Sequence, residues 1–415
     1  MKKIYLFLLS AFALTQVSLA QPGWTVYSYT TSTNIPNTTF NSIAIDQTGN
    51  IWAGTSYSGI VKYNGTSWSK FTQTNSNILH DFTNDILVDN SNKVWVGTYK
   101  GVSVYNGTNF TNYDTLNASF KGSEVYSLGK DNNGVIWLAS KIGSFGYKGL
   151  TTYNGSTWTN LTGLPSQVTS TDFGGYAFTS TNDAWIANGN GMLKYSGSVF
   201  TFYPKATTGL WNSKAIAKDA SGNIWAGGFD GLLKYSTTGT WTMRDNVADL
   251  GLTSNTLFYD ILVDGNYLWL ATSSGLLKFN MNTGIIEANY KAGNSPLTTN
   301  CVTDLAKDAS GKIWMSTCIG IVKMDPTVVI GIEEIKSEGP FKIYPNPSNG
   351  DYNFSYDGFT NLNFKIYSIT GSLISEGKTN SNNFKINLND QVNGMYFVHL
   401  ETENSVKQVV KLIKN

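Results

Sequence analysis

Tryptophan recurs through most of this chain at a regular interval and in near-identical surroundings, and this repeat restricts the fold more than any other feature. The seven copies stand 40 to 48 residues apart and are Trp52, Trp95, Trp137, Trp185, Trp225, Trp269 and Trp314. An interval of about 40 to 50 residues in strand-forming sequence indicates a repeated unit of several short strands that packs against its neighbours.

Each unit contains the same four segments. An apolar segment that ends in aspartate, such as Ile43–Asp46, is followed by a polar turn and then by the tryptophan segment, such as Ile51–Thr55. A third segment runs from glycine to an aromatic residue, as in Gly59–Tyr63, and a fourth begins with an aromatic residue, such as Trp68. A single small sheet cannot bury both faces, whereas a closed ring of sheets can. We therefore predict an all-β fold with a seven-bladed β-propeller over residues 21–326.

The repeated residues have expected structural roles in such a ring. Tryptophan is large enough to fill the wedge between neighbouring sheets, and aspartate forms turns by accepting hydrogen bonds from turn backbone. The fourth unit departs most from the pattern, because Thr179 stands where the other units have the turn aspartate.

The two ends of the repeat region complement each other. The last unit ends near Lys323–Asp325 without a fourth strand, whereas the first unit is preceded by a spare aromatic segment, Trp24–Tyr29. We expect this N-terminal segment to act as a latch strand that completes the last blade and closes the ring.

The phrase Asp-x-x-Gly-x-Ile-Trp-x-Gly-Thr, which begins at Asp46 and is followed by Gly-x-x-x-Tyr ending at Tyr63, resembles the two-component regulator propeller repeat. The resemblance covers roughly residues 24–325 and implies seven-bladed rings like those in the periplasmic sensor halves of hybrid histidine kinases. Those sensors commonly have two rings. This sequence has repeats for one ring and no recognisable kinase module or transmembrane helix, which argues against a sensor ectodomain.

Residues 1–20 have the pattern of an export signal peptide. Lys2 and Lys3 precede an apolar run, 4–14, that is too short to span a bilayer. We expect cleavage between Ala20 and Gln21, and a retained membrane anchor is the alternative interpretation.

The repeat stops after Asp325, and the proline, glycine and acidic residues of 327–340 indicate a linker. From residue 341 to residue 415, alternating segments separated by glycine and Asn-Gly turns predict a small Ig-like antiparallel β-sandwich.

Several short motifs of this C-terminal part resemble the type A C-terminal sorting domain of the type IX secretion system of Bacteroidota. They are Tyr344–Pro347, Gly350, Ile366–Gly371, Asn393–Tyr396 and Lys407–Lys411. The resemblance implies export through the periplasm and across the outer membrane with the type IX secretion machinery as partner. It also implies removal of this domain and release or attachment of the protein at the cell surface. An accessory binding sandwich is the alternative.

The chain has two cysteines, Cys301 and Cys318, on either side of the last tryptophan hairpin. If 308–311 is the hairpin turn, Leu305 faces Trp314 and the two cysteines face each other. Such partners have Cα atoms about 4.5 to 5.5 Å apart, which suits a disulfide, and the export route is oxidising. A cross-strand disulfide is one expectation, and two buried free thiols are the other.

Large side chains occupy several loops where most units have only glycine and serine. We expect them on one face of the ring, around its central channel, as ligand-binding candidates: Tyr57, Tyr99, Lys100, Phe145, Tyr147, Trp211, Phe229, Asp230 and His80. Exposed aromatic side chains on a rigid scaffold suit sugar faces or peptide partners. Ordinary packing between blades is the alternative for each residue.

The sequence offers little for catalysis. With two histidines, His80 and His399, and no nucleophile elbow or phosphate loop, we expect no catalytic residue, metal site or cofactor. A net charge of +1 without a basic run indicates no nucleic-acid partner. We therefore predict a secreted or cell-surface, monomeric propeller that binds a glycan, peptide or protein. The alternative is an extracellular polysaccharide lyase or hydrolase with paired titratable side chains at the channel mouth.

Overall fold

The computed structural model describes residues 23–120, 122–141, 148–170, 172–180, 183–328, 341–356, 361–368, 373–381, 383–402 and 407–415. The chain forms two compact units, Met1–Val328 and Val329–Asn415. The expected signal peptide with its cleavage site at Ala20 and Gln21, the candidates Phe145 and Tyr147, and residues 329–340 of the expected linker lie outside the described residues.

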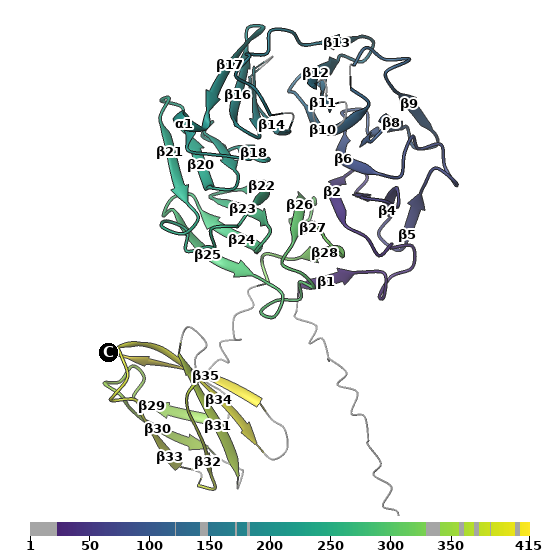
Figure 1. Cartoon of the computed structure of the whole chain (residues 1–415). Coiled ribbons are helices and arrows are strands. Elements are labelled where there is room, and N and C mark those ends of the chain that lie inside the picture. The colour runs from purple at the N-terminus through teal and green to yellow at the C-terminus, as the bar shows by residue number, and fades with distance from the viewer. Residues whose placement is uncertain are drawn as a thin grey trace, which may run out of the picture. The chain divides into compact units, whose positions relative to one another are not determined.

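The first unit is a ring of seven four-stranded antiparallel sheets, as predicted (Figure 1). Blade 1 consists of β2 (Phe40–Ile45), β3 (Ile51–Thr55), β4 (Ile60–Tyr63) and β5 (Trp68–Phe71). Blade 2 consists of β6 (Thr83–Val88), β7 (Val94–Thr98), β8 (Gly101–Tyr105) and β9 (Phe110–Tyr113). Blade 3 consists of β10 (Glu124–Lys130), β11 (Ile136–Lys141), β12 (Lys148–Tyr153) and β13 (Trp158–Asn160).

Blades 4 to 6 follow the same order. Blade 4 consists of β14 (Phe173–Ser180), β15 (Asp183–Asn188), β16 (Gly191–Ser196) and β17 (Val199–Pro204), followed by the single-turn helix α1 (Lys205–Thr208). Blade 5 consists of β18 (Ala215–Lys218), β19 (Ile224–Gly227), β20 (Gly231–Tyr235) and β21 (Trp241–Asp245). Blade 6 consists of β22 (Phe258–Asp264), β23 (Tyr267–Thr272), β24 (Gly275–Asn280) and β25 (Ile285–Tyr290).

Blade 7 combines both ends of the ring. Its strands are β26 (Val302–Lys307), β27 (Ile313–Thr317), β28 (Gly320–Met324) and, on the outer edge, β1 (Trp24–Tyr27). Trp24 pairs with Met324 and Tyr27 with Ile321, so the expected N-terminal latch strand is confirmed. The first strand of each blade, here called the inner strand, borders the central channel (Figure 1).

The seven repeated tryptophans fill the wedges between blades, as predicted. Each is only 1–4% exposed. Trp52 packs on Tyr105 of blade 2 at 5.3 Å between ring centroids, and Trp185 packs on Tyr235 of blade 5 at 4.7 Å. Every blade therefore buries its largest side chain against the next blade.

The turn aspartates accept hydrogen bonds from these tryptophans as well as from the turn backbone. In six blades the indole Nε1 donates to the aspartate carboxylate at 2.9–3.4 Å, at Asp46, Asp89, Asp131, Asp219, Asp264 and Asp308. Burial alone would raise the pKa of Asp46, but hydrogen bonds from Trp52, Thr48 and Asn50 outweigh it and lower that pKa. Blade 4 has Thr179 instead, so this carboxylate bond cannot form there.

The register of the last inner strand differs from the sequence prediction by one residue. Leu305 pairs with Met315 rather than with Trp314, because the hairpin turn extends to Lys312, whose carbonyl accepts the Asp308 N–H; a bulge between Val302 and Asp304 then shifts the register back by one residue. A bulge adds one unpaired residue to one strand of a pair. The pairing register on one side of the bulge therefore differs by one residue from the register on the other side.

The same bulge explains why the cysteine pairing holds. Beyond it, Val302 pairs with Thr317, which brings Cys301 and Cys318 side by side. Their Cα atoms lie 5.6 Å apart and the two residues form a disulfide.

The second unit is a small antiparallel sandwich of two sheets, in agreement with the predicted Ig-like domain. One sheet has β29 (Phe341–Tyr344), β30 (Asp351–Tyr356) and β33 (Asn383–Asn387). The other has β32 (Leu373–Thr379), β31 (Leu362–Ser368), β34 (Gly394–Thr402) and β35 (Lys407–Lys414). Tyr352, Phe354, Val398 and Leu412 are at most 1% exposed and belong to its core.

Candidate functional site

Two sets of loops define two faces of the ring. The upper face consists of the loops after the tryptophan strands and the loops that enter the inner strands. The lower face consists of the aspartate turns and the turns between the third and fourth strands. The sequence candidates that the structure describes all lie in upper-face loops: Tyr57, His80, Tyr99, Lys100, Trp211, Phe229 and Asp230.

Blades 1 and 2 present an aromatic cluster on the upper face. Tyr57 is 76% and Tyr99 49% exposed. Both rings contact Phe82, with centroids 5.3 and 6.2 Å away, and Tyr99 also contacts His80 at 5.6 Å. His80 Nδ1 accepts the Phe82 backbone N–H at 2.9 Å, so His80 shapes the loop that supports the cluster. Lys100 is exposed beside it.

A second cluster surrounds Trp211, which is 50% exposed. Its ring lies 5.7 Å from that of Phe229, and the Lys205 ammonium lies 5.6 Å from it. Asp230 accepts hydrogen bonds from the Trp211 backbone N–H at 2.7 Å and from Lys205 Nζ at 2.9 Å. Asp230 therefore positions Trp211, since both of its carboxylate oxygens already accept hydrogen bonds from this part of the chain.

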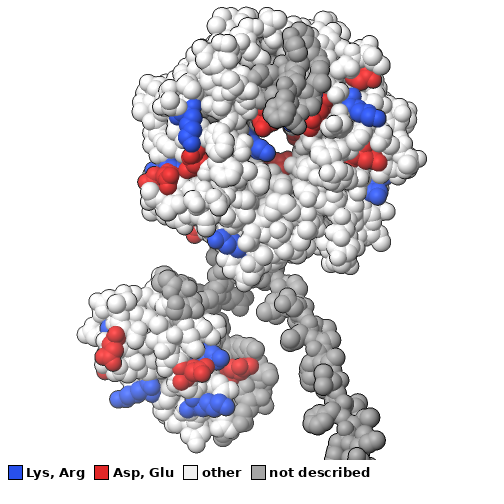
Figure 2. Space-filling view, viewed as in Figure 1, with Lys and Arg blue, Asp and Glu red and all other residues white. Residues whose placement is uncertain are grey.

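Charged side chains meet where blades 3 and 4 adjoin on the upper face. Lys141 Nζ lies 4.0 Å from Glu124 and 3.7 Å from Asp172, and it also lies 5.1 Å from the Tyr126 ring centroid. Figure 2 shows acidic and basic side chains at the rim of the central hollow. Two carboxylates thus flank one ammonium group where the inner strand β10 begins and β11 ends. Glu124 and Asp172 are titratable upper-face residues that the sequence offers for the enzyme alternative, whereas Lys141 between them was not foreseen.

The inner strands carry a belt of polar side chains that sequence analysis missed. Five blades have serine or aspartate directly after the bulge of the inner strand: Ser42, Asp85, Ser127, Asp260 and Asp304. The signal was present, because a serine or aspartate recurs at one register position of these strands.

Each side chain of this inner belt reaches the next blade. Asp304 accepts the Ile43 N–H at 2.7 Å, and Asp85 accepts the Leu128 N–H at 2.7 Å and the Ser42 hydroxyl at 3.0 Å. Since buried backbone N–H groups require partners, these bonds join neighbouring blades at the channel.

The belt carboxylates keep some contact with the channel but lie deep within the protein. Burial raises the pKa of Asp85 to about 6. Burial, followed by the charges of Asp260 and Asp85, raises the pKa of Asp304 well above its ordinary value, and burial also raises that of Asp260. Within the described residues, no three His, Cys, Asp or Glu side chains form a group that could hold a metal ion.

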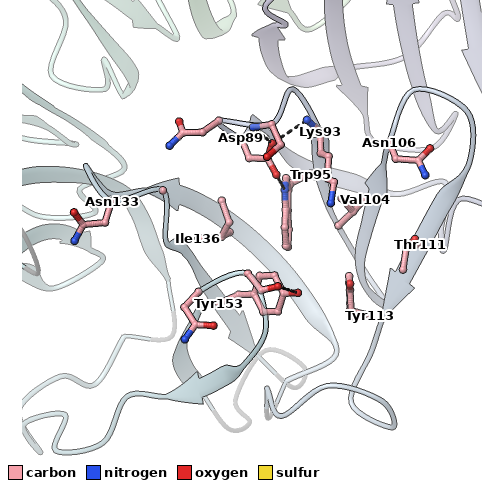
Figure 3. A pocket seen from close by; sticks show the side chains of 15 residues that line it. Asp89, Lys93, Trp95, Val104, Asn106, Thr111, Tyr113, Asn133, Ile136 and Tyr153 are labelled. Carbon is pink, nitrogen blue, oxygen red and sulfur yellow. Dashed lines mark hydrogen bonds between the residues drawn. The ribbon is translucent and has the colours of Figure 1, made fainter.

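A groove of about 450 Å³ opens on the lower face between blades 2 and 3 (Figure 3). Asp89, Trp95 and Val104 line it from blade 2, and Asn133 and Tyr153 line it from blade 3. None of the sequence candidates lies in this groove.

Two family models match the chain. Residues 342–415 match the secretion system C-terminal sorting domain, and residues 34–57, in blade 1, match the two component regulator propeller. The second unit is a secretion system C-terminal sorting domain. Both resemblances seen in the sequence are confirmed, and the sorting domain implies that this propeller protein is secreted to the cell surface.

Solved structures share the fold at low sequence identity. The extracellular domain of the putative hybrid two component system BT3049 from B. thetaiotaomicron has 16% identity and a TM-score of 0.62, covering 95% of this chain and 58% of that chain. PorZ, an essential bacterial surface component of the type-IX secretion system of Porphyromonas gingivalis, has 19% identity and a TM-score of 0.56, covering 90% of this chain and 59% of that chain. The chain thus spans less than two thirds of either relative.

Virginiamycin B lyase from Staphylococcus aureus matches a smaller share of this chain. It has 15% identity and a TM-score of 0.58, with 72% of this chain and 98% of that chain covered. No curated protein matches the chain. In the part of the chain that the structure describes, no helix has both the length and the apolar character needed to cross a membrane.

Proposed function

We propose that the secreted propeller is a binding module that recognises a glycan, a peptide or a protein through its upper face. The observation that carries this proposal is the exposure of three large aromatic side chains, Tyr57, Tyr99 and Trp211, in loops of one face. Exposed aromatic rings that cost little conformational entropy to fix are the usual anchors of binding surfaces.

The loops hold these rings in place before any ligand arrives. Phe82 supports both tyrosines, and Asp230 fixes the backbone of Trp211. A surface that is already ordered loses little freedom on binding, so more of the contact energy remains as affinity.

The test is a glycan and peptide array probed with the full mature protein. Trp211→Ala and Tyr99→Ala should each weaken binding by about ten- to a hundredfold, the effect of losing one aromatic anchor. Ile285→Ala is the matched control, because Ile285 is 61% exposed but lies at the start of an outer strand, next to a lower-face turn. Unchanged binding by both aromatic variants would count against the upper face.

The Lys141 cluster supports a second candidate, a polysaccharide lyase or hydrolase. Lys141 between Glu124 and Asp172, beside Tyr126, provides paired titratable groups of the kind that acid–base catalysis requires. Incubation with a polysaccharide panel should release new reducing or unsaturated ends. Glu124→Gln and Asp172→Asn should then abolish the release while leaving array binding intact, and absence of any product contradicts this candidate.

A further inference from the structure

The lower-face groove occurs where the repeat loses a recurring side chain. In five blades the residue paired with the repeated tryptophan on the third strand is lysine, with Nζ 5.0–5.8 Å from the indole centre: Lys62, Lys194, Lys234, Lys278 and Lys323. In blade 2 the residue paired with Trp95 is Val104. The shorter side chain leaves space beside the indole, and both residues line the groove (Figure 3).

Blade 3 shows why a missing lysine alone does not create a groove. Thr152 pairs with Trp137 there, but the rings of Phe178 and Tyr195 from blade 4 lie 5.6 and 5.4 Å from that tryptophan. Beside Trp95, the strand position equivalent to Phe178 holds Lys130. Its Nζ donates to the Val88 carbonyl at 3.1 Å. The groove therefore occurs where Val104 replaces the recurring lysine and the next blade has Lys130, as blades 5 and 7 have Lys218 and Lys307, instead of an aromatic ring like Phe178.

We propose that this groove binds a short, uncharged saccharide. Its volume of about 450 Å³ lies within the range of small-molecule sites, about 300 to 1,000 Å³. Two charged side chains of opposite sign line it, Asp89 and Lys93, so the groove favours neither anions nor cations. Tyr113 and Tyr153 add aromatic rings, which suit the C–H faces of sugars.

Asparagines supply hydrogen-bonding groups on both walls. Asn106 Oδ1 accepts two turn N–H groups of blade 2 at 3.0 and 2.9 Å, and Asn154 Oδ1 accepts two of blade 3 at 3.0 and 2.8 Å. Both side chains are exposed, and both line the groove. Because the turns use the amide oxygens, the Nδ2 groups are the ends available to donate to sugar hydroxyls.

The groove suits a saccharide better than an extended peptide. Peptides that add a strand pair along an unpaired sheet edge, and of the strands that line this groove only β9 lies at such an edge, while the other lining residues belong to turns and to strands paired on both sides. Side-chain amides and aromatic rings remain as its recognition groups.

The variant Val104→Lys tests the proposal directly. It restores the residue that five other blades carry, so the protein should keep its melting temperature while the new side chain fills the groove. On an array of neutral oligosaccharides, the full mature protein should bind a ligand that Val104→Lys binds at least about tenfold more weakly. The matched control is Thr152→Lys, whose site is already filled by aromatic rings.

Two conservative variants separate recognition from folding. Asn106→Asp and Asn154→Asp keep the turn-accepting oxygen and remove the Nδ2 donor, so each should weaken saccharide binding several-fold without lowering the melting temperature. Unchanged binding in Val104→Lys would overturn the proposal. It would also be overturned if no neutral saccharide on the array bound the protein, or if the ligand that Val104→Lys fails to bind were a peptide. A ligand that Val104→Lys weakens and Trp211→Ala does not belongs to the groove, and a ligand with the opposite pattern belongs to the upper face, so the two proposals can fail separately.

Discussion

Asp260 and Asp304 bring two carboxyl groups together where blades 6 and 7 adjoin the central channel. Burial raises the pKa of both, and the nearby charges of Asp260 and Asp85 raise that of Asp304 further. Adjacent carboxylates resist double ionisation, so we expect Asp304 and Asp260 to share one proton. These residues were not predicted as a pair, because the sequence does not show which residues of different blades meet at the channel.

The pH dependence of stability should reveal this shared proton. A carboxyl group with a raised folded pKa stabilises the protein fully below its unfolded pKa, and this contribution is lost as pH rises through the folded pKa. The melting temperature should therefore fall as pH rises above the ordinary carboxyl pKa of about 4, and Asp304→Asn, which mimics the protonated acid, should flatten that fall. Differential scanning calorimetry across this range measures both.

A matched control is Asp325→Asn. Hydrogen bonds from Thr327 lower the pKa of Asp325, so this variant should leave the alkaline side of the profile unchanged. An equal loss of stability in Asp304→Asn at every pH would contradict the shared proton.

The strands of the propeller were predictable because the same sequence pattern marks them in each repeat. Glycine-containing turns, the Ile-Trp segment and the aromatic end of the third strand recur in sequence, and the strands β2 to β5 follow them closely. The bulge before Asp304 was not predictable from one hairpin, since an extra residue leaves the alternation on either side intact. The serine or aspartate that recurs at the position of the inner belt is the signal that would have located the bulge.

The disulfide across β26 and β27 closes a short loop, with a sequence separation of 17. Cross-linking a loop of this length restricts the unfolded chain and contributes roughly 3 kcal/mol. The double variant Cys301→Ser with Cys318→Ser should lose about that amount in denaturant unfolding, and reducing agent should destabilise only the parent protein. Identical unfolding of parent and double variant would contradict a structural role for the bond.

At the scale of the molecule, ring closure depends on the junction between blades 7 and 1. Tyr27, on the latch strand, packs on Trp314 at 5.7 Å, on Tyr63 at 5.3 Å and on Trp68 at 5.4 Å between ring centroids. The sequence predicted this closure because the last unit lacks a strand and the first has one to spare. The binding loops were less predictable, since their neighbours belong to other blades.

Tyr27→Ala should weaken the whole ring. Removing a fully buried aromatic side chain costs about 3 to 5 kcal/mol, so the loss for the partly buried Tyr27 should be below that range, and because the junction joins both ends of the ring the unfolding transition should also broaden. Tyr29→Ala is the control, since Tyr29 lies two residues on and is 55% exposed. Equal melting curves for the two variants would show that the packing of the latch strand does not contribute to the stability of the ring.

The composite seventh blade also fixes an order of events during biosynthesis. Strand β1 emerges first from the ribosome, yet its partner β28 is made almost 300 residues later. Blades 1 to 6 contain only consecutive strands, so they can assemble while the chain is still growing, whereas the seventh must wait. A prematurely terminated chain therefore keeps β1 without its partner strand, and such an unpaired edge is a template for pairing with another chain.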